Sequence, residues 1–436
     1  MQSNNIDRRT FNRVSAMTAM TLGATGTANA AVSANDRIGV GFVGTGTRGI
    51  QLLKIFLQKP DVDVVAFCDV YQPNLERAQK LLNRPVETYG DFRKLIDRQD
   101  IDAVVIATPD HWHALQETAA CDAGKDVYVE KPLSTTVHEG RKMVDAARRN
   151  NRVVQVGTHR RSSELYPQLA ELIADDYLGK ITVSRAYRLS NMYPGGMGKA
   201  YPSSPPADLD WDMWLGPRPL REYQDNIAPY KFRWWQQYSS QMANWGVHFL
   251  DVIRWLTNEK APASVCAMGG QFAVDDDRTV PDTMEVTFQF ASGRLAIFGQ
   301  YEANGAAALK QGEIELRGTQ GTAYIGGKGF EILPERGGQF QDRGTRAKAI
   351  SVTADERNLA MTGRHVRNFL DCIKSRKRPI ADVEVGHRST SMSLLANISL
   401  AVQARLDWDA EREQITNHEL ANNLLHYEYR KPWKLG

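Results

Sequence analysis

Five short apolar segments alternate with amphipathic segments in the first third of the chain. The apolar segments are β-rich and nearly continuous, which is typical of strands covered on both faces. The segments between them carry apolar residues at helical spacing and end in Gly or Asn. This alternation predicts right-handed crossovers and a doubly wound parallel sheet. The predicted strands are residues 37–44, 62–69, 101–108, 126–131 and 152–158.

The pattern changes after Arg161. Residues 282–302 and 312–333 alternate apolar and polar positions about Gly-containing turns, which predicts hairpins of an antiparallel sheet with one solvated face. Residues 361–377 and 385–404 then have helical spacing, and the tail has little pattern. The pattern therefore predicts two structurally different parts.

An aromatic segment, residues 191–240, separates these patterns. It is rich in Pro, Gly and Trp and is too long for an ordinary loop. The large apolar side chains of Trp211, Trp214, Trp234 and Trp235 need packing partners, which argues against disorder. Two interpretations stay open: a plug for the domain or a subunit interface, or a wall on which a sugar stacks.

Composition narrows the function classes. A chain of 436 residues exceeds one hydrophobic core, and 42% hydrophobic with 24% charged residues is ordinary for a soluble globular protein. A net charge of +3 makes nucleic acid an unsuitable partner. The four cysteines share no short spacing, so neither a disulfide scaffold nor a metal site is predicted.

The N-terminus has the plan of a twin-arginine export signal over residues 1–30. Arg8 and Arg9 precede a weakly apolar stretch and the small-residue sequence Ala28-Asn29-Ala30. A disordered basic tail is the alternative. We expect a periplasmic or secreted protein, and no segment approaches the ~20 apolar residues of a membrane span.

A glycine-rich turn follows the first predicted strand. Gly44 permits the tight turn, Gly46 admits a pyrophosphate, and Gly49 lets the next helix lie close to the strand. Asp69 ends the next strand and would accept hydrogen bonds from a ribose, which favours NAD over NADP, although Arg48 could weaken that preference. The turn residues expected to bind the cofactor are Gly44, Gly46, Thr47, Arg48 and Gly49.

The predicted strand at 101–108 also leads into polar residues. Carboxyl ends of parallel strands face the ligand crevice, so we expect Thr108, Pro109, His111 and His113 beside the cofactor or just behind it. No carboxylate or cysteine completes a metal site around the two histidines.

The sequence Glu130-Lys131-Pro132 ends the strand at 126–131. By the same geometry Lys131 emerges at the crevice beside the nicotinamide, where a partly dry pocket would lower its pKa and let it exchange a proton with a hydroxyl. Glu130 would orient the lysine and contact the cofactor site. A strand-end ion pair without chemistry is the alternative.

Four motifs, "GTGTRG" with Asp69, "ATPDHWHA", "EKPLS" and "NWGVHFLDVIRWL", resemble the Gfo/Idh/MocA oxidoreductases over residues 36–405. The resemblance implies an α/β fold class: an N-terminal Rossmann doubly wound parallel sheet plus a C-terminal α/β domain with an open, mainly antiparallel sheet. It also implies that Lys131 is catalytic and that the second sheet supports a homo-oligomer. The implied domains are an NAD-binding domain at 36–160, a substrate and oligomerisation domain at 161–405, and a tail at 406–436.

The family's second catalytic motif is an Asp and a His four residues apart. Here His248 matches the histidine and Asn244 stands at the acid position, so Asn244 can orient a sugar or the histidine but carries no charge. Asp251 is a candidate replacement partner. The residues expected to contact substrate, besides the catalytic Lys131, His248 and Asn244, are Arg160, Arg161, Trp235 and Asp251.

These features together predict an NAD-dependent oxidoreductase acting on a sugar or cyclic polyol hydroxyl, with a tightly bound cofactor. The alternative is a redox-neutral NAD-dependent glycoside hydrolase or lyase that acts through a transient keto-sugar. A third interpretation, a catalytically silent sugar sensor, is favoured by Asn244 and opposed by the presence of Lys131 and His248.

Overall fold

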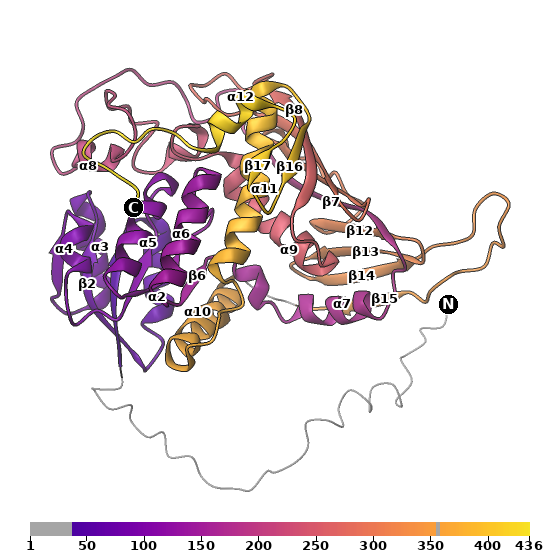
Figure 1. The fold of residues 1–436 in the computed structure, drawn as a ribbon, viewed down its shortest axis with the longest axis horizontal. Helices are drawn as coiled ribbons and strands as arrows, with labels where there is room; N and C mark the ends of the chain where they lie inside the picture. Colours follow the sequence, from indigo (N-terminus) through magenta and orange to yellow (C-terminus); the bar gives the residue numbers. More distant parts are fainter. Residues whose placement is uncertain (1–36, 355–357) are drawn as a thin grey trace, which may run out of the picture. The chain divides into compact units, whose positions relative to one another are not determined.

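Six parallel strands form the first sheet, in the order β3-β2-β1-β4-β5-β6. Figure 1 shows this part of the chain in indigo to magenta, with helices α2 to α6 around the sheet. The computed structural model describes residues 37–354 and 358–436, so the predicted export signal at 1–30 lies outside the described residues. The doubly wound parallel sheet is confirmed; the short, partly polar β3 was not predicted. The strands are β1 (Ile38–Val43), β2 (Val62–Cys68), β3 (Glu87–Tyr89), β4 (Ala103–Ile106), β5 (Asp126–Val129) and β6 (Val154–Val156).

Helices follow most of these strands. α6 begins with a capping box, in which the Thr136 side chain accepts from the Glu139 amide and the Glu139 side chain accepts from the Thr136 amide. Phe42, Phe56 and Tyr128 pack edge to face in the core beneath. The elements are α2 (Thr47–Phe56), α3 (Gln72–Leu82), α4 (Phe92–Ile96), η2 (Asp110–Trp112), α5 (His113–Asp122), α6 (Val137–Arg149) and η3 (His159–Ser162).

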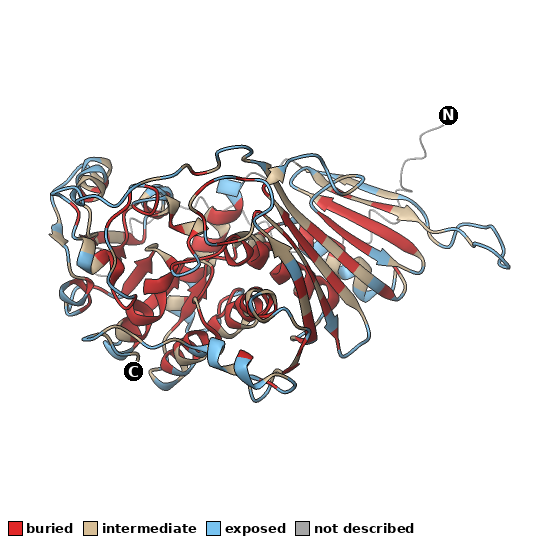
Figure 2. Cartoon of the chain, turned by 90° about the horizontal axis from the view of Figure 1, so that it is seen from above, coloured by how far each residue is buried: buried red, intermediate tan, exposed pale blue. Residues whose placement is uncertain are grey.

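The second sheet has eleven strands and is mainly antiparallel, as predicted. Its central path runs β15-β14-β13-β12-β7-β10-β9-β8-β16-β17, with β11 paired to β7, and only β7 and β10 run parallel. Figure 2 shows buried segments alternating with less buried ones along strands of the chain. Burial alternates along β9, where Met284, Val286, Phe288 and Phe290 are buried. The strands are β7 (Ile181–Asn191), β8 (Pro262–Gly270), β9 (Thr283–Phe290), β10 (Leu295–Tyr301), β11 (Ala303–Asn304), β12 (Ile314–Gly318), β13 (Gly321–Gly326), β14 (Gly329–Pro334), β15 (Ile350–Thr353), β16 (Leu406–Asp409) and β17 (Gln414–Ile415).

Helices from the C-terminal half complete the first core. Val366, Phe369 and Leu370 of α10 pack with Phe42 and its neighbours beneath the first sheet. None of the helices among the described residues combines the length and apolar character needed to cross a membrane. The remaining helices are α7 (Leu165–Ala174), α8 (Trp211–Leu215), η4 (Lys231–Trp234), η5 (Met242–Gly246), α9 (Val247–Thr257), α10 (Asn358–Ser375), α11 (Val383–Val402), α12 (Glu419–Asn422) and η6 (Asn423–Leu425).

The aromatic segment and the tail are both packed. Trp214, Phe232, Trp235 and Tyr238 belong to a separate apolar cluster, so the predicted demand for packing partners is met. In the tail, Trp433 lies edge-on to Trp112, with 4.8 Å between ring centroids. The tail thus packs against the turn that follows β4, even though its sequence has little pattern.

Candidate active site

Close backbone approaches shape the glycine-rich turn between β1 and α2. Gly44 has a φ of 85°, and a Cβ at Gly49 would lie 2.1 Å from the Gly44 carbonyl oxygen. A Cβ at Gly46 would meet nothing nearer than the Asn74 side chain at 3.8 Å. Space therefore remains at Gly46, beside the N-terminus of α2, where a phosphate group fits.

A cleft of about 220 Å³ opens beside this turn. The aromatic segment supplies much of its apolar lining, through Leu209, Met213, Trp214, Tyr230 and Phe232. Of the residues predicted to bind the cofactor, the cleft is lined by Gly44, Gly46, Thr47, Arg48, Asp69, Thr108 and Pro109.

The carboxylate of Asp69 borders the cleft at the end of β2. It accepts hydrogen bonds from the Thr45 amide at 2.7 Å, the Tyr71 amide at 3.0 Å and the Asn74 side chain at 3.1 Å. Burial raises the pKa of Asp69, although these hydrogen bonds favour its charged form. Asp69 thus fixes the turn and also contributes an acceptor group to the cleft lining.

The two histidines expected beside the cofactor or just behind it are buried next to residues that line the cleft, Trp214 and Thr108. His111 and His113 are at most 1% exposed, and neither ring lines the cleft. The His113 ring nitrogens lie 2.8 Å from the Pro132 carbonyl and 3.1 Å from the Thr108 carbonyl. Burial by η2 and α5 turns the rings toward the backbone, so Trp112 and Gln116 line the cleft instead.

Lys131 emerges at the end of β5, and its Nζ donates to the Asn244 side-chain oxygen at 2.7 Å and carbonyl oxygen at 2.9 Å. Burial lowers the pKa of Lys131 to about 8, against the opposing charge of Glu130. Glu130 accepts from the Lys131 amide and pairs with Arg48 at 2.6 Å. Arg48 therefore points its charge at Glu130, and the Lys131 amine can change protonation near neutral pH.

Asn244 and His248 do not form the predicted helical pair. Asn244 lies in η5, a π-helical turn that runs directly into α9, and its side chain bonds Lys131 and Gln241. A π turn changes the spacing on which the i, i+4 prediction depends. The asparagine consequently orients the lysine.

His248 instead faces His159, with 5.2 Å between ring centroids. Among the described residues, neither ring has a hydrogen-bond partner at its buried Nδ1. Burial, and then the charge of Lys131, lowers the pKa of His248 well below its usual value, and burial does the same for His159. Both rings are therefore neutral near pH 7. From the sequence, His159 is expected at the edge of the cleft because it follows β6, but no role is assigned to it.

Asp251, proposed as partner of His248 or as a substrate ligand, has its carboxylate already occupied. It is 0% exposed, binds Arg161 through two contacts of 2.8 and 2.9 Å, and accepts from Ser389 at 2.6 Å. The buried bidentate pair uses the carboxylate, and a role for Asp251 at the substrate stays a prediction. Arg160 forms an ion pair with Glu313 at 2.8 Å. A role for Arg160 in substrate binding stays a prediction.

Comparison with solved structures gives a consistent fold. Levoglucosan dehydrogenase in complex with NADH and levoglucosan aligns with a TM-score of 0.65 at 19% identity, over 85% of this chain and 99% of that one. An NAD-binding oxidoreductase from Klebsiella pneumoniae aligns with a TM-score of 0.64 at 19% identity over the same shares. At these identities the likeness establishes the fold alone.

Sequence relatives match a shorter stretch. Proteins named glycosyl hydrolase family 109 protein, from Shewanella sp. (strain W3-18-1) and Shewanella putrefaciens (strain CN-32 / ATCC BAA-453), are 38% identical over 125 residues. That stretch is 27% of this chain and 27% of each relative. The match thus takes in about a quarter of those proteins.

Two family matches cover most of the chain. Residues 38–158 match the oxidoreductase family's NAD-binding Rossmann fold, and residues 168–435 match its C-terminal alpha/beta domain. The second match alone takes in more than half of the chain. The chain therefore belongs to the Gfo/Idh/MocA family of oxidoreductases.

Proposed function

We propose that this protein is an NAD-dependent oxidoreductase that acts on a hydroxyl group of a sugar or cyclic polyol and keeps its cofactor tightly bound. The observation that carries the proposal is the environment of Lys131. Its amine follows β5, is held by Asn244, and has a pKa lowered by burial to about 8. A lysine poised in this way is suited to proton exchange with a substrate hydroxyl.

The cofactor cleft fits NAD through its own residues. The open space at Gly46 and the N-terminus of α2 suit a pyrophosphate, and Asp69 suits a ribose. The Asp69 carboxylate would also repel a 2′-phosphate, and Arg48 is occupied by Glu130. When bound, NAD supplies the acceptor for the hydride that leaves the substrate carbon.

Proton transfer falls to Lys131. The neutral amine accepts the proton of the substrate hydroxyl as the carbon loses its hydride, so an alcohol becomes a carbonyl compound and the amine becomes an ammonium group. Asn244 holds Nζ in place. The neutral rings of His248 and His159 hydrogen-bond neighbouring substrate hydroxyls.

Cofactor retention follows from the aromatic segment. Met213, Trp214, Tyr230 and Phe232 give the cleft an apolar wall, which lowers the tendency of a bound dinucleotide to leave. Retention suits the proposed twin-arginine export, which carries proteins that have already folded around a cofactor. Outside the cytoplasm, a retained cofactor must be regenerated within each catalytic cycle.

A second candidate is a redox-neutral glycoside hydrolase. The glycosyl hydrolase family 109 name of the relatives that are 38% identical over 125 residues favours it. Here the same oxidation gives a keto-sugar, and loss of a proton from the carbon next to the carbonyl expels the glycosidic substituent, which takes up a proton and leaves as an alcohol. Water then adds to the unsaturated ketone, its hydroxyl replacing the substituent and a proton returning to the neighbouring carbon, and the returned hydride restores the alcohol. Lys131 would then accept and return the same proton.

One experiment separates the two candidates. Purified protein, without added cofactor, is incubated with a nitrophenyl glycoside panel, with levoglucosan and with pairs of free sugars. Coupled oxidation and reduction, or reduction of the bound cofactor by levoglucosan, supports the oxidoreductase. Nitrophenol release without net change in cofactor absorbance supports the hydrolase. No turnover of any substrate class contradicts both.

A further inference from the structure

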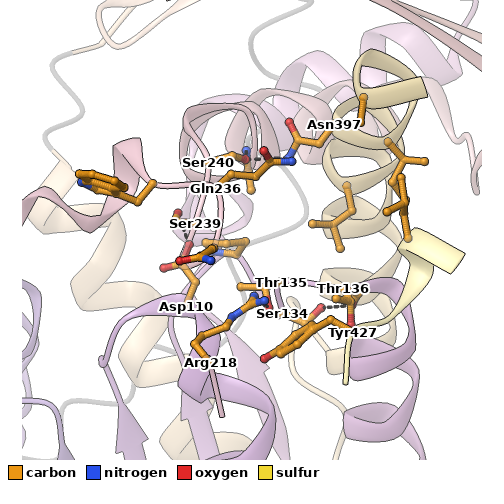
Figure 3. A pocket seen from close by; sticks show the side chains of 18 of the residues that line it. Asp110, Ser134, Thr135, Thr136, Arg218, Gln236, Ser239, Ser240, Asn397 and Tyr427 are labelled. Carbon is orange, nitrogen blue, oxygen red and sulfur yellow. Dashed lines mark hydrogen bonds between the residues drawn. The ribbon is translucent and has the colours of Figure 1, made fainter. Parts of the chain in front are cut away.

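A second cavity, of about 530 Å³, lies apart from the cofactor cleft (Figure 3). Its lining comes from the loop before α6, the aromatic segment, α11 and residues 424–427. Among the described residues, none lines both cavities. The cavity does adjoin the catalytic pair along the chain, since its lining includes Pro132, next to Lys131, and Ala243, next to Asn244.

Arg218 is the most distinctive group in this lining. It is 8% exposed, donates from Nη2 to the Thr135 hydroxyl at 2.9 Å, and places its guanidinium 3.6 Å from the centre of the Tyr427 ring. Figure 3 shows its side chain pointing toward Thr135 and Tyr427. Its buried Nε has no hydrogen-bond partner within residues 37–354 and 358–436. A buried charged donor without a partner is costly, so an acceptor from a ligand is the expected complement.

The charge of the lining favours an anion. Arg218 and Arg221 contribute two positive charges and Asp110 one negative charge, so with neutral His426 the described lining has a net charge of 2 − 1 = +1. Asp110 accepts from the Ser239 hydroxyl. The nearby Glu139 carboxylate already accepts from Thr135, Thr136 and Tyr429. Arg218 therefore keeps capacity for an incoming oxyanion.

The rest of the lining suits a polyhydroxylated ring. Trp235 borders the cavity and is 6% exposed, with the Arg221 guanidinium 4.5 Å from the centre of its ring. Hydroxyl and amide groups surround it, and Asn397 donates to the Ser240 hydroxyl at 2.8 Å across one side of the cavity (Figure 3). Aromatic faces combined with such groups are suited to apolar and polar contacts with a sugar. The further polar lining residues are Ser134, Thr135, Thr136, Gln236, Gln237 and Ser239.

We propose that this cavity binds an anionic saccharide, with the acidic group of the sugar at Arg218 and its ring against Trp235. The proposal goes beyond the proposed function, because it concerns binding at a site separate from the cofactor cleft and holds whichever reaction the enzyme catalyses. A charged guanidinium-to-carboxylate contact should make a uronate bind at least about tenfold more tightly than the corresponding neutral sugar.

Calorimetric titration of the full-length protein tests this inference, with D-glucuronate, D-glucose and sodium sulfate as probes. Lys131→Ala serves as background, so that turnover adds no heat. Arg218→Gln should weaken glucuronate binding at least about tenfold, Arg218→Lys less. Ala401→Trp, at an exposed lining position on α11, should weaken it by filling space, and Arg412→Gln, an exposed charge elsewhere, should not.

Each other outcome overturns the inference. Glucuronate that does not bind, or binds equally to Arg218→Gln and Ala401→Trp, uses no site in this cavity. If glucose binds as tightly as glucuronate, the cavity does not recognise the negative charge. If sulfate binds as tightly as glucuronate, the cavity is a simple anion site that does not recognise the sugar. If Arg218→Gln does not fold, the affinity of Ala401→Trp for glucuronate tests whether the ligand binds in this cavity. Turnover of neutral sugars by Arg412→Gln separately reports on the proposed function and should equal that of the unaltered protein.

Discussion

Two buried histidine pairs lie near the edge where the parallel strands end, and they differ in their surroundings. His113 has backbone carbonyls at both ring nitrogens, and His111 bonds the Trp214 carbonyl at 2.9 Å. His159 and His248 face each other, with buried Nδ1 atoms that have no partner in the described part of the chain. A strand-end position is common to His111, His113 and His159, and the buried Nδ1 of His111 likewise has no partner among the described residues. What sets His248 apart is an unpartnered nitrogen close enough to Lys131 for the lysine charge to lower its pKa, so the two features together are the better indicator of a site.

Proton transfer is proposed for the group of residues around Lys131, which includes Asn244 and His248. Of these residues, we expect replacement of Lys131 to cause the largest loss of turnover. Lys131→Ala should lower turnover by about 10²- to 10⁴-fold, because the proton acceptor is removed. Bound NAD, measured after denaturation of the purified protein, should stay near the unaltered amount, since Lys131 does not line the cleft. Lys54→Ala, an exposed lysine of α2, is the matched control. Normal turnover in Lys131→Ala would remove the lysine from the mechanism.

His248 and His113 should respond differently to replacement by alanine. His248→Ala should lower turnover by about 100-fold, because a neutral ring that contacts the substrate is lost. His113→Ala should instead lower the free energy of unfolding by about 2–4 kcal/mol, because two buried carbonyls lose their partner. Steady-state kinetics and urea unfolding on both variants supply the readouts. If His113→Ala loses more turnover than His248→Ala while staying folded, the comparison fails.

Replacement of His111 should have a smaller effect, which concerns NAD release. Its ring and the Trp112 indole both contact the Trp214 carbonyl, at 2.9 and 3.1 Å, and the Trp214 side chain lines the cofactor cleft. His111→Ala should therefore speed NAD release by about tenfold, which corresponds to about 1.4 kcal/mol of lost support. Turnover at saturating NAD should stay within about twofold. Stopped-flow displacement of bound NADH measures release, and unchanged release would contradict the positioning role.

Local sequence patterns predicted more of the fold than of the site. The parallel strands, the turn at Gly44 and the alternation along 282–302 are local signals, and the structure contains each of them. The pairing of Arg161 with Asp251 depends on where η3 and α9 meet, which no local pattern encodes. The packing of α10 against the first core is equally non-local.

Two further features of the site could not be predicted from the sequence, because they also depend on how distant segments pack. The π turn at Asn244 has no distinct sequence signature, so i, i+4 spacing paired the asparagine with His248 when its side chain bonds Lys131. The aromatic segment was expected either to plug a surface or to stack a sugar, and it lines both the cofactor cleft and the second cavity. Such contacts form between segments that are far apart in the chain.

The smallest expected effect concerns Asn244 and the pH at which Lys131 works. Burial places the pKa of Lys131 near 8, and only the neutral amine accepts a proton, so sugar oxidation should rise as pH increases through about 8. Asn244→Asp puts a negative charge 2.7 Å from Nζ, which favours the ammonium form and should move this rise upward by about one pH unit. At a fixed pH below the rise, turnover would then fall about tenfold, because each unit of pKa changes the neutral fraction tenfold. Asn397→Asp, in the second cavity, is the matched control and should keep the original profile. An unchanged profile in Asn244→Asp would mean that the rise reports a group other than Lys131, and the assignment of the proton to the lysine would have to be abandoned.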